Sequence, residues 1–81
     1  MRHEEDMAVL ANFMPVIKYG SKGDIVKALQ TILKRYGWFM GNPNGIADSD
    51  TVKGIKLFQI AFGLEENGVL DAVGWARLLI G

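Results

Sequence analysis

The sequence contains no cysteine, which excludes disulfide bridges, zinc–thiolate sites and a cysteine nucleophile. Its nine basic and nine acidic residues give a formal net charge of zero, so no overall field attracts nucleic acid or an anionic membrane. The one histidine, His3, lies near the N-terminus, where no nucleophile, base and orienting group can be assembled around it. The sequence also lacks a cluster of three or four metal ligands. We therefore expect no catalytic site, no metal and no cofactor.

Long apolar runs are missing too, and nothing approaches the length of a membrane span. The opening MRHEEDMAVLANFM carries acids where a secretory signal peptide has a basic region, so no signal peptide is expected in this chain. What is present is an ordinary globular composition, 49% hydrophobic and 22% charged, over 81 residues. This length suits one small domain. We expect a monomer that contacts neither nucleic acid nor membrane.

Apolar residues recur at helical spacing in four segments, and strand content is expected to be negligible. The predicted helices occupy His3–Met14, most of Gly20–Gly37, Asp48–Phe62 and Asp71–Leu79. One arc of the first helix collects its apolar residues, namely Met7, Leu10, Phe13 and Met14. Pro15 stops that helix.

Polar residues at the helix starts predict the caps. Ser21 or Asp24 can cap the second helix, and Gly37 suits the left-handed residue that follows its end. Asp48 and Asp71 stand at the N-cap positions of the third and fourth helices.

A weak internal repeat relates NGIADSDT at Asn44–Thr51 to NGVLDAVG at Asn67–Gly74. Each unit is a turn, a short extended pair and a capped helix. A calcium loop of the EF-hand kind would need oxygen ligands over twelve residues and a closing glutamate, which does not follow here. Asp48 and Asp50 are two residues apart, so on a helix they point in different directions and cannot act as paired catalytic carboxylates. The start of a helix is the better interpretation.

Short elements run through both halves of the chain in a fixed order. The first half contains Gly20-Ser-Lys-Gly23, Val26, Leu29-Gln30, Leu33 and Gly37. The second half contains Asn44-Gly45-Ile46, Thr51, Ile55-Lys56, Phe58-Gln59, Gly63-Leu64, Asn67-Gly68-Val69, Trp75 and Leu78. Together they resemble the peptidoglycan-binding domain of bacterial and phage cell-wall hydrolases, over about Ile17 to Leu79.

The resemblance implies an all-α fold, a compact three-helix bundle over residues 17–81 with an additional short N-terminal helix in a leading segment, residues 1–16. It implies non-catalytic binding of bacterial cell-wall peptidoglycan. Such binding would target a linked or associated wall hydrolase, for example a phage endolysin, through avidity on a polymeric substrate. The chain would then act at the bacterial cell wall.

Five residues depart from the family pattern. Ala47 and Asp48 replace an aromatic residue and a glycine, and Asp71 replaces the glycine that is usual after the second turn. Gly54 and Gly74 stand where alanine and threonine are usual, and glycine inside a helix costs about 1 kcal/mol against alanine.

Sugar and stem-peptide ligands need aromatic faces with amide or hydroxyl partners around a shallow groove. The candidates for this role are Tyr36, Trp38, Phe39, Asn42, Asn44 and Gln59. Structural roles compete: Trp38 can plug the end of the core, Tyr36 can continue the apolar face of its helix, and Asn44 can fix a turn. Phe39 is expected to be exposed.

The glutamines Gln30 and Gln59 lie on or beside apolar faces, so their amides need hydrogen-bond partners. We expect both to pin loop backbone, with ligand contact as the alternative for Gln59. Trp75 is expected in the core.

Leu57 and Ile60 fall off the main apolar face of the third helix. Either the leading helix covers them, which we favour, or they contact a partner protein. The partner hypothesis makes the chain an interaction or assembly module, such as a phage structural component, built on the same bundle. An inhibitory pro-segment like that of matrix metalloproteases is a third class, but it needs a cysteine that this chain lacks.

Overall fold

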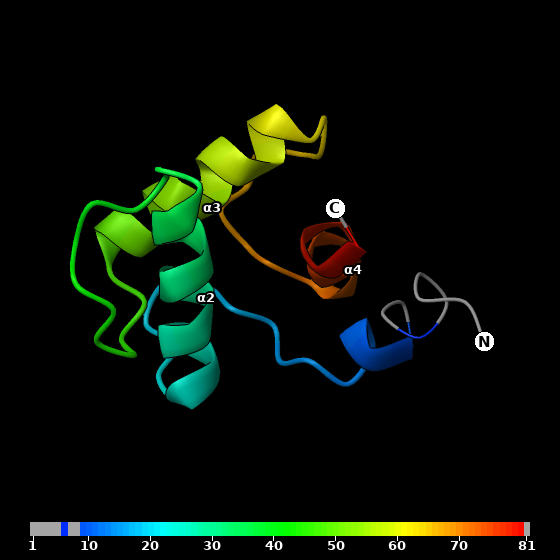
Figure 1. The fold of residues 1–81 in the computed structure, drawn as a ribbon, viewed down its shortest axis with the longest axis horizontal. Coiled ribbons are helices and arrows are strands. Elements are labelled where there is room, and N and C mark those ends of the chain that lie inside the picture. The colour runs from blue at the N-terminus through cyan, green and yellow to red at the C-terminus, as the bar shows by residue number, and fades with distance from the viewer. Residues whose placement is uncertain (1–5, 7–8, 81) are drawn as a thin grey trace.

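The computed structural model describes residue 6 and residues 9–80. Three helices make up the body: α2 (Asp24–Arg35), α3 (Ser49–Ala61) and α4 (Ala72–Ile80). Figure 1 shows α3 crossing one end of α2, with α4 on the far side of a long connection. Extended pairing in the described ranges is limited to two isolated bridges, Ile17 with Leu70 and Lys22 with Ile46. The all-α prediction is confirmed.

The core lies where the apolar stripes of the helices meet. Leu29 and Leu33 of α2, Ile55 and Phe58 of α3, and Trp75 of α4 are almost completely buried. Their spacing of three or four residues within a helix places them on one face, which is why these segments fold as helices against one another. Loop residues complete the core, among them Ile17, Phe39, Ala47 and Leu70.

The helix ends follow local chemistry, with one correction. The Asp48 carboxylate accepts hydrogen bonds from the backbone N–H of Thr51 at 3.0 Å and from its hydroxyl at 2.9 Å, as the predicted cap requires. Asp71 likewise accepts from the Gly74 N–H at 3.0 Å. The predicted side-chain cap of α2 is wrong: Gly23 occupies the N-cap without a side-chain bond.

Gly23 occupies that position because its φ of 133° lies in the left-handed region and its N–H donates to the Gly45 carbonyl at 2.9 Å. The two residues predicted to cap the helix have other positions. Ser21 accepts instead from the Lys18 N–H at 3.0 Å, and Asp24 lies in the first turn.

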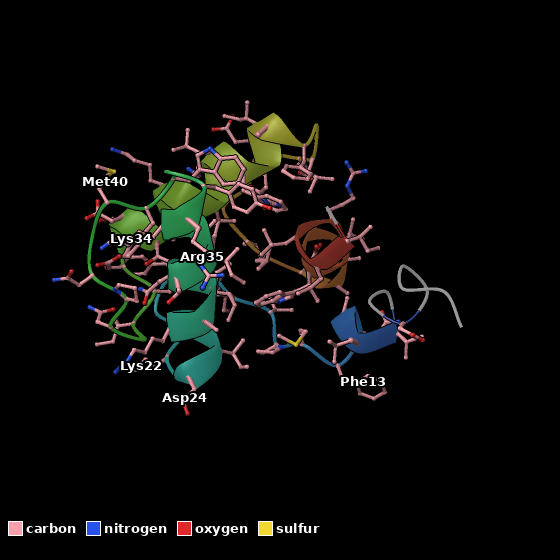
Figure 2. The ribbon with its side chains drawn as sticks, in the orientation of Figure 1. Phe13, Lys22, Asp24, Lys34, Arg35 and Met40 are labelled. Atoms are coloured by element: carbon pink, nitrogen blue, oxygen red, sulfur yellow. The ribbon has the colours of Figure 1, made fainter. Side chains whose placement is uncertain are left out.

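The leading segment docks on α4. Part of the helix predicted over His3–Met14 lies outside the described residues; residues 9–11 are helical. The Trp75 indole N–H donates to the Pro15 carbonyl at 2.8 Å, and two backbone bonds join Ile17 to Leu70. Ala11 is buried, whereas Phe13 is 80% exposed, and it projects away from the helices in Figure 2. Of the predicted apolar arc, Leu10 and Phe13 are exposed and Met14 packs against the core, while Met7 lies outside the described residues.

The leading segment does not cover Leu57 and Ile60, contrary to our prediction. These side chains on α3 are 40% and 57% exposed. The bonds to Trp75 and Leu70 hold the leading segment against α4 and the strand-like stretch before it (Figure 1). This docking depends on contacts distant in sequence, which helical periodicity does not reveal.

Candidate functional site

A buried glutamine organises the loop after α2. The side-chain carbonyl of Gln30 accepts hydrogen bonds from the backbone N–H groups of Asn44 and Gly45, both at 2.9 Å. Its amide nitrogen lies 2.9 Å from both the Ile46 carbonyl and the Thr51 hydroxyl, and 3.2 Å from the Asn44 side-chain oxygen. A fully buried amide satisfied in this way fixes the turn rigidly.

The second half of the chain repeats this arrangement. The Gln59 carbonyl oxygen accepts from the N–H groups of Asn67 and Gly68 at 3.1 and 3.0 Å. Its amide donates to the Asn67 side chain at 2.9 Å and to the Val69 carbonyl at 3.0 Å. The geometry agrees with loop pinning by both glutamines. Gln59 is buried, so its amide is occupied by the turn.

Asn44 and Asn67 have the corresponding turn role. The Asn44 side-chain oxygen accepts from the Ile46 N–H at 3.0 Å, and that of Asn67 accepts from the Val69 N–H at 2.9 Å. Such Asx turns mimic a backbone turn and use the side-chain oxygen as an acceptor within the turn. Asn44 thus serves conformation first.

Phe39 is buried, at 3% exposure, and not exposed as we expected. Its ring lies over the backbone of Gly41, where an added Cβ would come within 3.0 Å of the ring. The loop folds back over the ring, and the next residue, Met40, is exposed in its place. Neighbouring loop residues point to opposite sides here, which composition alone does not specify.

An aromatic surface forms where α2 and α3 end. We use this name for Tyr36, Trp38, Phe62 and Arg77. The Tyr36 and Trp38 rings stack with centroids 4.8 Å apart and an interplanar angle of 13°. Trp38 meets Phe62 edge-on at 6.3 Å, and the Arg77 guanidinium carbon lies 5.5 Å from the Phe62 centroid. These distances suit aromatic stacking and a cation–π contact.

The side chains of the aromatic surface become more exposed with distance from the core. Tyr36 is 48% exposed, Trp38 and Phe62 are half-buried, and Phe58 beneath them is fully buried. Trp38 lies 6.0 Å from Phe58, so it belongs to the core on one side and to the surface on the other. The core role predicted for Trp38 is thus seen in its contact with Phe58, and its ligand role stays a prediction. Phe62 and Arg77 were missed because their proximity depends on how α4 packs beside α3.

Asn42 is the predicted loop residue that stays free to contact a ligand. It is exposed and lies between Gly41 and the pinned turn. The Lys34 ammonium donates to the Gly41 carbonyl at 3.2 Å, which ties this part of the loop to α2. Figure 2 shows Lys34 and Met40 on the same side of the molecule. Four of the six predicted residues face solvent at least in part, and Phe39 and Gln59 do not; the four are Tyr36, Trp38, Asn42 and Asn44.

The chemistry available at this surface is binding. Flat, partly exposed rings present faces on which the apolar side of a sugar ring can stack, while the guanidinium and amide supply hydrogen bonds. Across residue 6 and residues 9–80, no group of three His, Asp or Glu side chains could hold a metal ion. Within the same residues, no helix has the length and hydropathy needed to cross a membrane.

Comparison with known families gives one match. The family model described as "Putative peptidoglycan binding domain" matches residues 22–78, which contain α2, α3 and most of α4. Both pinned turns and every member of the aromatic surface fall within this range.

Two solved structures share the fold and about a third of the sequence. The SleB N-terminal domain aligns with a TM-score of 0.74 and 32% identity, covering 82% of this chain and 89% of that one. A peptidoglycan-binding protein from Clostridioides difficile, solved with glutamine hydroxamate, aligns with a TM-score of 0.73 and 31% identity, covering 79% and 40%.

Curated relatives are longer than this chain. A chloroplastic protein of Arabidopsis thaliana, described as protein disulfide isomerase pTAC5, is 34% identical over 68 residues, which are 80% of this chain and 18% of that protein. An uncharacterized protein from the bpoA1 3' region of Kitasatospora aureofaciens is 32% identical over 65 residues, 79% of this chain and 55% of its own length. The chain thus spans about half the second relative and less than a fifth of the first.

Proposed function

Because the chain belongs to the peptidoglycan-binding domain family, we propose that it binds cell-wall peptidoglycan through the aromatic surface and so targets a linked wall hydrolase. Members of this family are binding modules and are generally non-catalytic. Family membership supports association with the cell wall. Of the relatives' printed functions, disulfide isomerisation needs thiols, and these 81 residues contain no cysteine.

The observation that carries the proposal is the stacked pair of Tyr36 and Trp38. A ring that is 48% exposed and stacked at 13° on its neighbour is held in place before a ligand arrives. Holding it this way reduces the ordering cost of binding. Arg77, 5.5 Å from the Phe62 ring centroid, and the exposed Asn42, on the loop that follows Trp38, supply a guanidinium and an amide, the polar partners that sugar hydroxyls and acyl groups need.

A binding module directs a hydrolase to the cell wall when the two are joined in one molecule. A shallow surface binds a single sugar unit weakly, but peptidoglycan repeats that unit along a polymer. A module joined to a hydrolase raises the effective concentration of the second contact once the first has formed, so weak sites suffice.

Co-sedimentation with purified, protein-free sacculi tests the proposal. We expect the native chain to bind and Tyr36→Ala to bind about fivefold more weakly, the effect of an interface residue worth about 1 kcal/mol. Phe13→Ala is the matched control, because it removes an exposed ring on the leading segment, far along the chain from Tyr36. Circular dichroism checks that each variant is folded. Equal binding by Tyr36→Ala and the native chain would reject this surface.

A second candidate function, protein–protein interaction or assembly, is favoured by the exposure of Leu57 and Ile60. Exposed aliphatic pairs on a helix can seat a partner. The hypothesis gains support if the folded native chain fails to sediment with sacculi and self-associates in analytical ultracentrifugation in a manner lost in a Leu57→Glu/Ile60→Glu variant. A native chain that stays monomeric in that experiment contradicts assembly with itself.

A further inference from the structure

A surface hollow of about 310 Å³ lies along the N-terminal half of α3. Its lining combines an aromatic ring, two ammonium groups and two small side chains, those of Tyr19, Lys53, Lys56, Val52 and Ser49. None of these residues belongs to the aromatic surface. The lining contains two lysines and no acidic side chain, so we name it the lysine hollow.

The walls of the lysine hollow are fixed by backbone hydrogen bonds. The Gly20 N–H donates to the Ala47 carbonyl and the Ala47 N–H to the Ser21 carbonyl, both at 2.8 Å. These bonds clamp the turn that carries Tyr19 against the residues just before α3. Tyr19 itself is 71% exposed, so its ring is presented to solvent from an anchored backbone.

One of the two lysines is held in place by the second pinned turn. A Cβ placed on Gly68 would meet Lys56 Cε at 3.2 Å and Val52 Cγ1 at 2.8 Å, so the glycine backbone lies directly against both side chains. Lys56 is half-buried along its aliphatic stem, whereas Lys53 is exposed. A lysine with an ordered stem loses less rotamer freedom when its ammonium meets an anion.

Two other hollows of the described surface have linings of different charge. The hollow at the start of α2 has one lysine, Lys22, and one acid, Asp24. The hollow beside the second turn has two acids, Glu65 and Asp71, and no basic residue. The lysine hollow is therefore the one of the three whose lining selects for an anion.

We propose that the lysine hollow binds carboxylate groups of the peptidoglycan stem peptide, as a second contact separate from the aromatic surface. This proposal rests on the proposed function, since it names the part of the same polymer that the chain holds there. The two ammonium groups pair with carboxylates, and Tyr19 covers the apolar atoms between them. Lys53 and Phe62 are nine residues apart on or just past α3, roughly 13 Å along the helix axis and on opposite sides of it. The rings and the lysines are therefore two separate contacts, for glycan and for peptide, on a polymer that repeats both.

The test compares two double variants on sacculi freed of phosphate-containing polymers, so that carboxylates are the remaining anions. Lys53→Gln/Lys56→Gln removes the hollow's charge, and Lys22→Gln/Lys27→Gln removes the same charge from the start of α2, where Figure 2 places Lys22. Since exposed ion pairs each change binding by about two- to fivefold, we expect the first variant to bind about five- to tenfold more weakly at low salt. The control should stay within about twofold, and high salt should close the gap.

Equal losses in the two double variants would overturn the proposal, because only the overall charge would then matter. A native chain that binds no sacculi at all would instead overturn the proposed function, and the lysine hollow with it. Native binding that Tyr36→Ala weakens but Lys53→Gln/Lys56→Gln leaves unchanged would overturn the hollow alone. Circular dichroism of both double variants confirms folding, which Lys→Gln changes should preserve because none of the four lysines is buried and glutamine is nearly as good a helix former as lysine.

Chemical change of the wall provides the complementary arm. Converting the carboxylates of the same sacculi to amides should weaken the native chain about as much as the double substitution does, and should leave Lys53→Gln/Lys56→Gln unchanged. A lysine-dependent difference that persists on amidated sacculi would overturn the assignment of the carboxylate. A loss that occurs only on sacculi that still carry phosphate polymers would assign the hollow to phosphate and likewise overturn it.

Discussion

The two Asn-Gly turns are held by the same kind of amide, but the connections that lead to them differ in length. Fourteen residues separate Gln30 from Asn44, whereas eight separate Gln59 from Asn67. In the first half α2 runs to Arg35, well beyond its glutamine, and a longer loop follows. In the second half α3 ends at Ala61 and the chain reaches its turn almost at once.

The longer connection carries the residues suited to a ligand. Tyr36, Trp38 and Asn42 all lie between Arg35 and the first turn, while the shorter connection carries Glu65 and Glu66. The repeated glutamine and turn hold each loop end in place, which leaves the residues between them free to vary. The comparison teaches that the shared part of the repeat is structural, and the added residues include those that we propose for binding.

Removing either glutamine amide should produce the largest loss of stability, and the loss should differ between the two repeats. Gln30→Met keeps the volume but leaves the N–H groups of Asn44 and Gly45 without their acceptor, and it removes the donor to the Thr51 hydroxyl, which still donates to Asp48. We expect a loss of about 3 kcal/mol in the free energy of unfolding, measured by urea denaturation. Gln59→Met, which lacks a counterpart of the Thr51 bond, should lose about 2 kcal/mol. A larger loss for Gln59→Met would contradict the ranking.

The second largest difference between the repeats should come from alanine at the glycine inside α3 and at the glycine inside α4. An added Cβ on Gly54 would lie 2.8 Å from the Trp38 backbone carbonyl, which cannot move without shifting the first connection. On Gly74 the nearest atom, at 2.6 Å, is the end of the flexible Leu70 side chain. Overpacking costs about 1–3 kcal/mol, against a gain of about 1 kcal/mol in helix propensity. We expect Gly54→Ala to lower the free energy of unfolding by about 1 kcal/mol.

Gly74→Ala should be close to neutral in the same denaturation experiment, because Leu70 can change rotamer to make room. If Gly54→Ala instead stabilised the protein, the Trp38 carbonyl would have to move away from the added Cβ.

From sequence alone, each glycine only lowers the stability of the helix that contains it. The structure gives Gly54 a reason, the close approach of another backbone segment.

The cap of α3 should show as a pH dependence. The Thr51 backbone N–H, followed by its hydroxyl, holds the pKa of the Asp48 carboxyl below its ordinary value of 3.8. A group with a lowered folded pKa stabilises the fold above its unfolded pKa and loses this contribution as pH falls through the folded pKa. We therefore expect the unfolding temperature, measured between pH 6 and pH 2, to fall below about pH 4 as this contribution is lost.

Asp48→Asn is the matched variant, because asparagine caps a helix as well as aspartate but does not titrate. Its unfolding temperature should depend less on pH in that window, and at neutral pH the two proteins should differ by less than about 1 kcal/mol. Parallel pH curves for the two proteins would remove Asp48 from the acid response.

Sequence patterns located the elements that depend on neighbours along the chain. The caps at Asp48 and Asp71, the stop at Gly63 and the glutamine-held turns all rest on contacts within one repeat, whose chemistry is visible in the residues themselves. Gly63, with φ of 69°, ends α3 as a left-handed glycine should.

The predictions that were wrong concern contacts between segments distant in the sequence. The Gly23 N–H reaches the Gly45 carbonyl, which displaces the expected side-chain cap of α2. Phe39 turns inward because the loop closes over it, and Leu57 stays exposed because the leading segment docks on α4. The aromatic surface mixes both cases: Tyr36 and Trp38 were visible in sequence, but Phe62 and Arg77 joined them through packing.

The smallest expected effect concerns the added residues of the first connection. Asn42 is exposed, so Asn42→Ala should leave the free energy of unfolding unchanged within about 0.5 kcal/mol. If its amide contacts the wall polymer, co-sedimentation with sacculi should show binding about two- to threefold weaker, the size of one exposed hydrogen bond of about 0.5 kcal/mol. Met40→Ser, two residues earlier and 88% exposed, is the control and should change neither quantity. Weaker binding in both variants would assign the contact to the loop as a whole, whereas a loss confined to Asn42→Ala would assign it to the Asn42 amide on the longer connection.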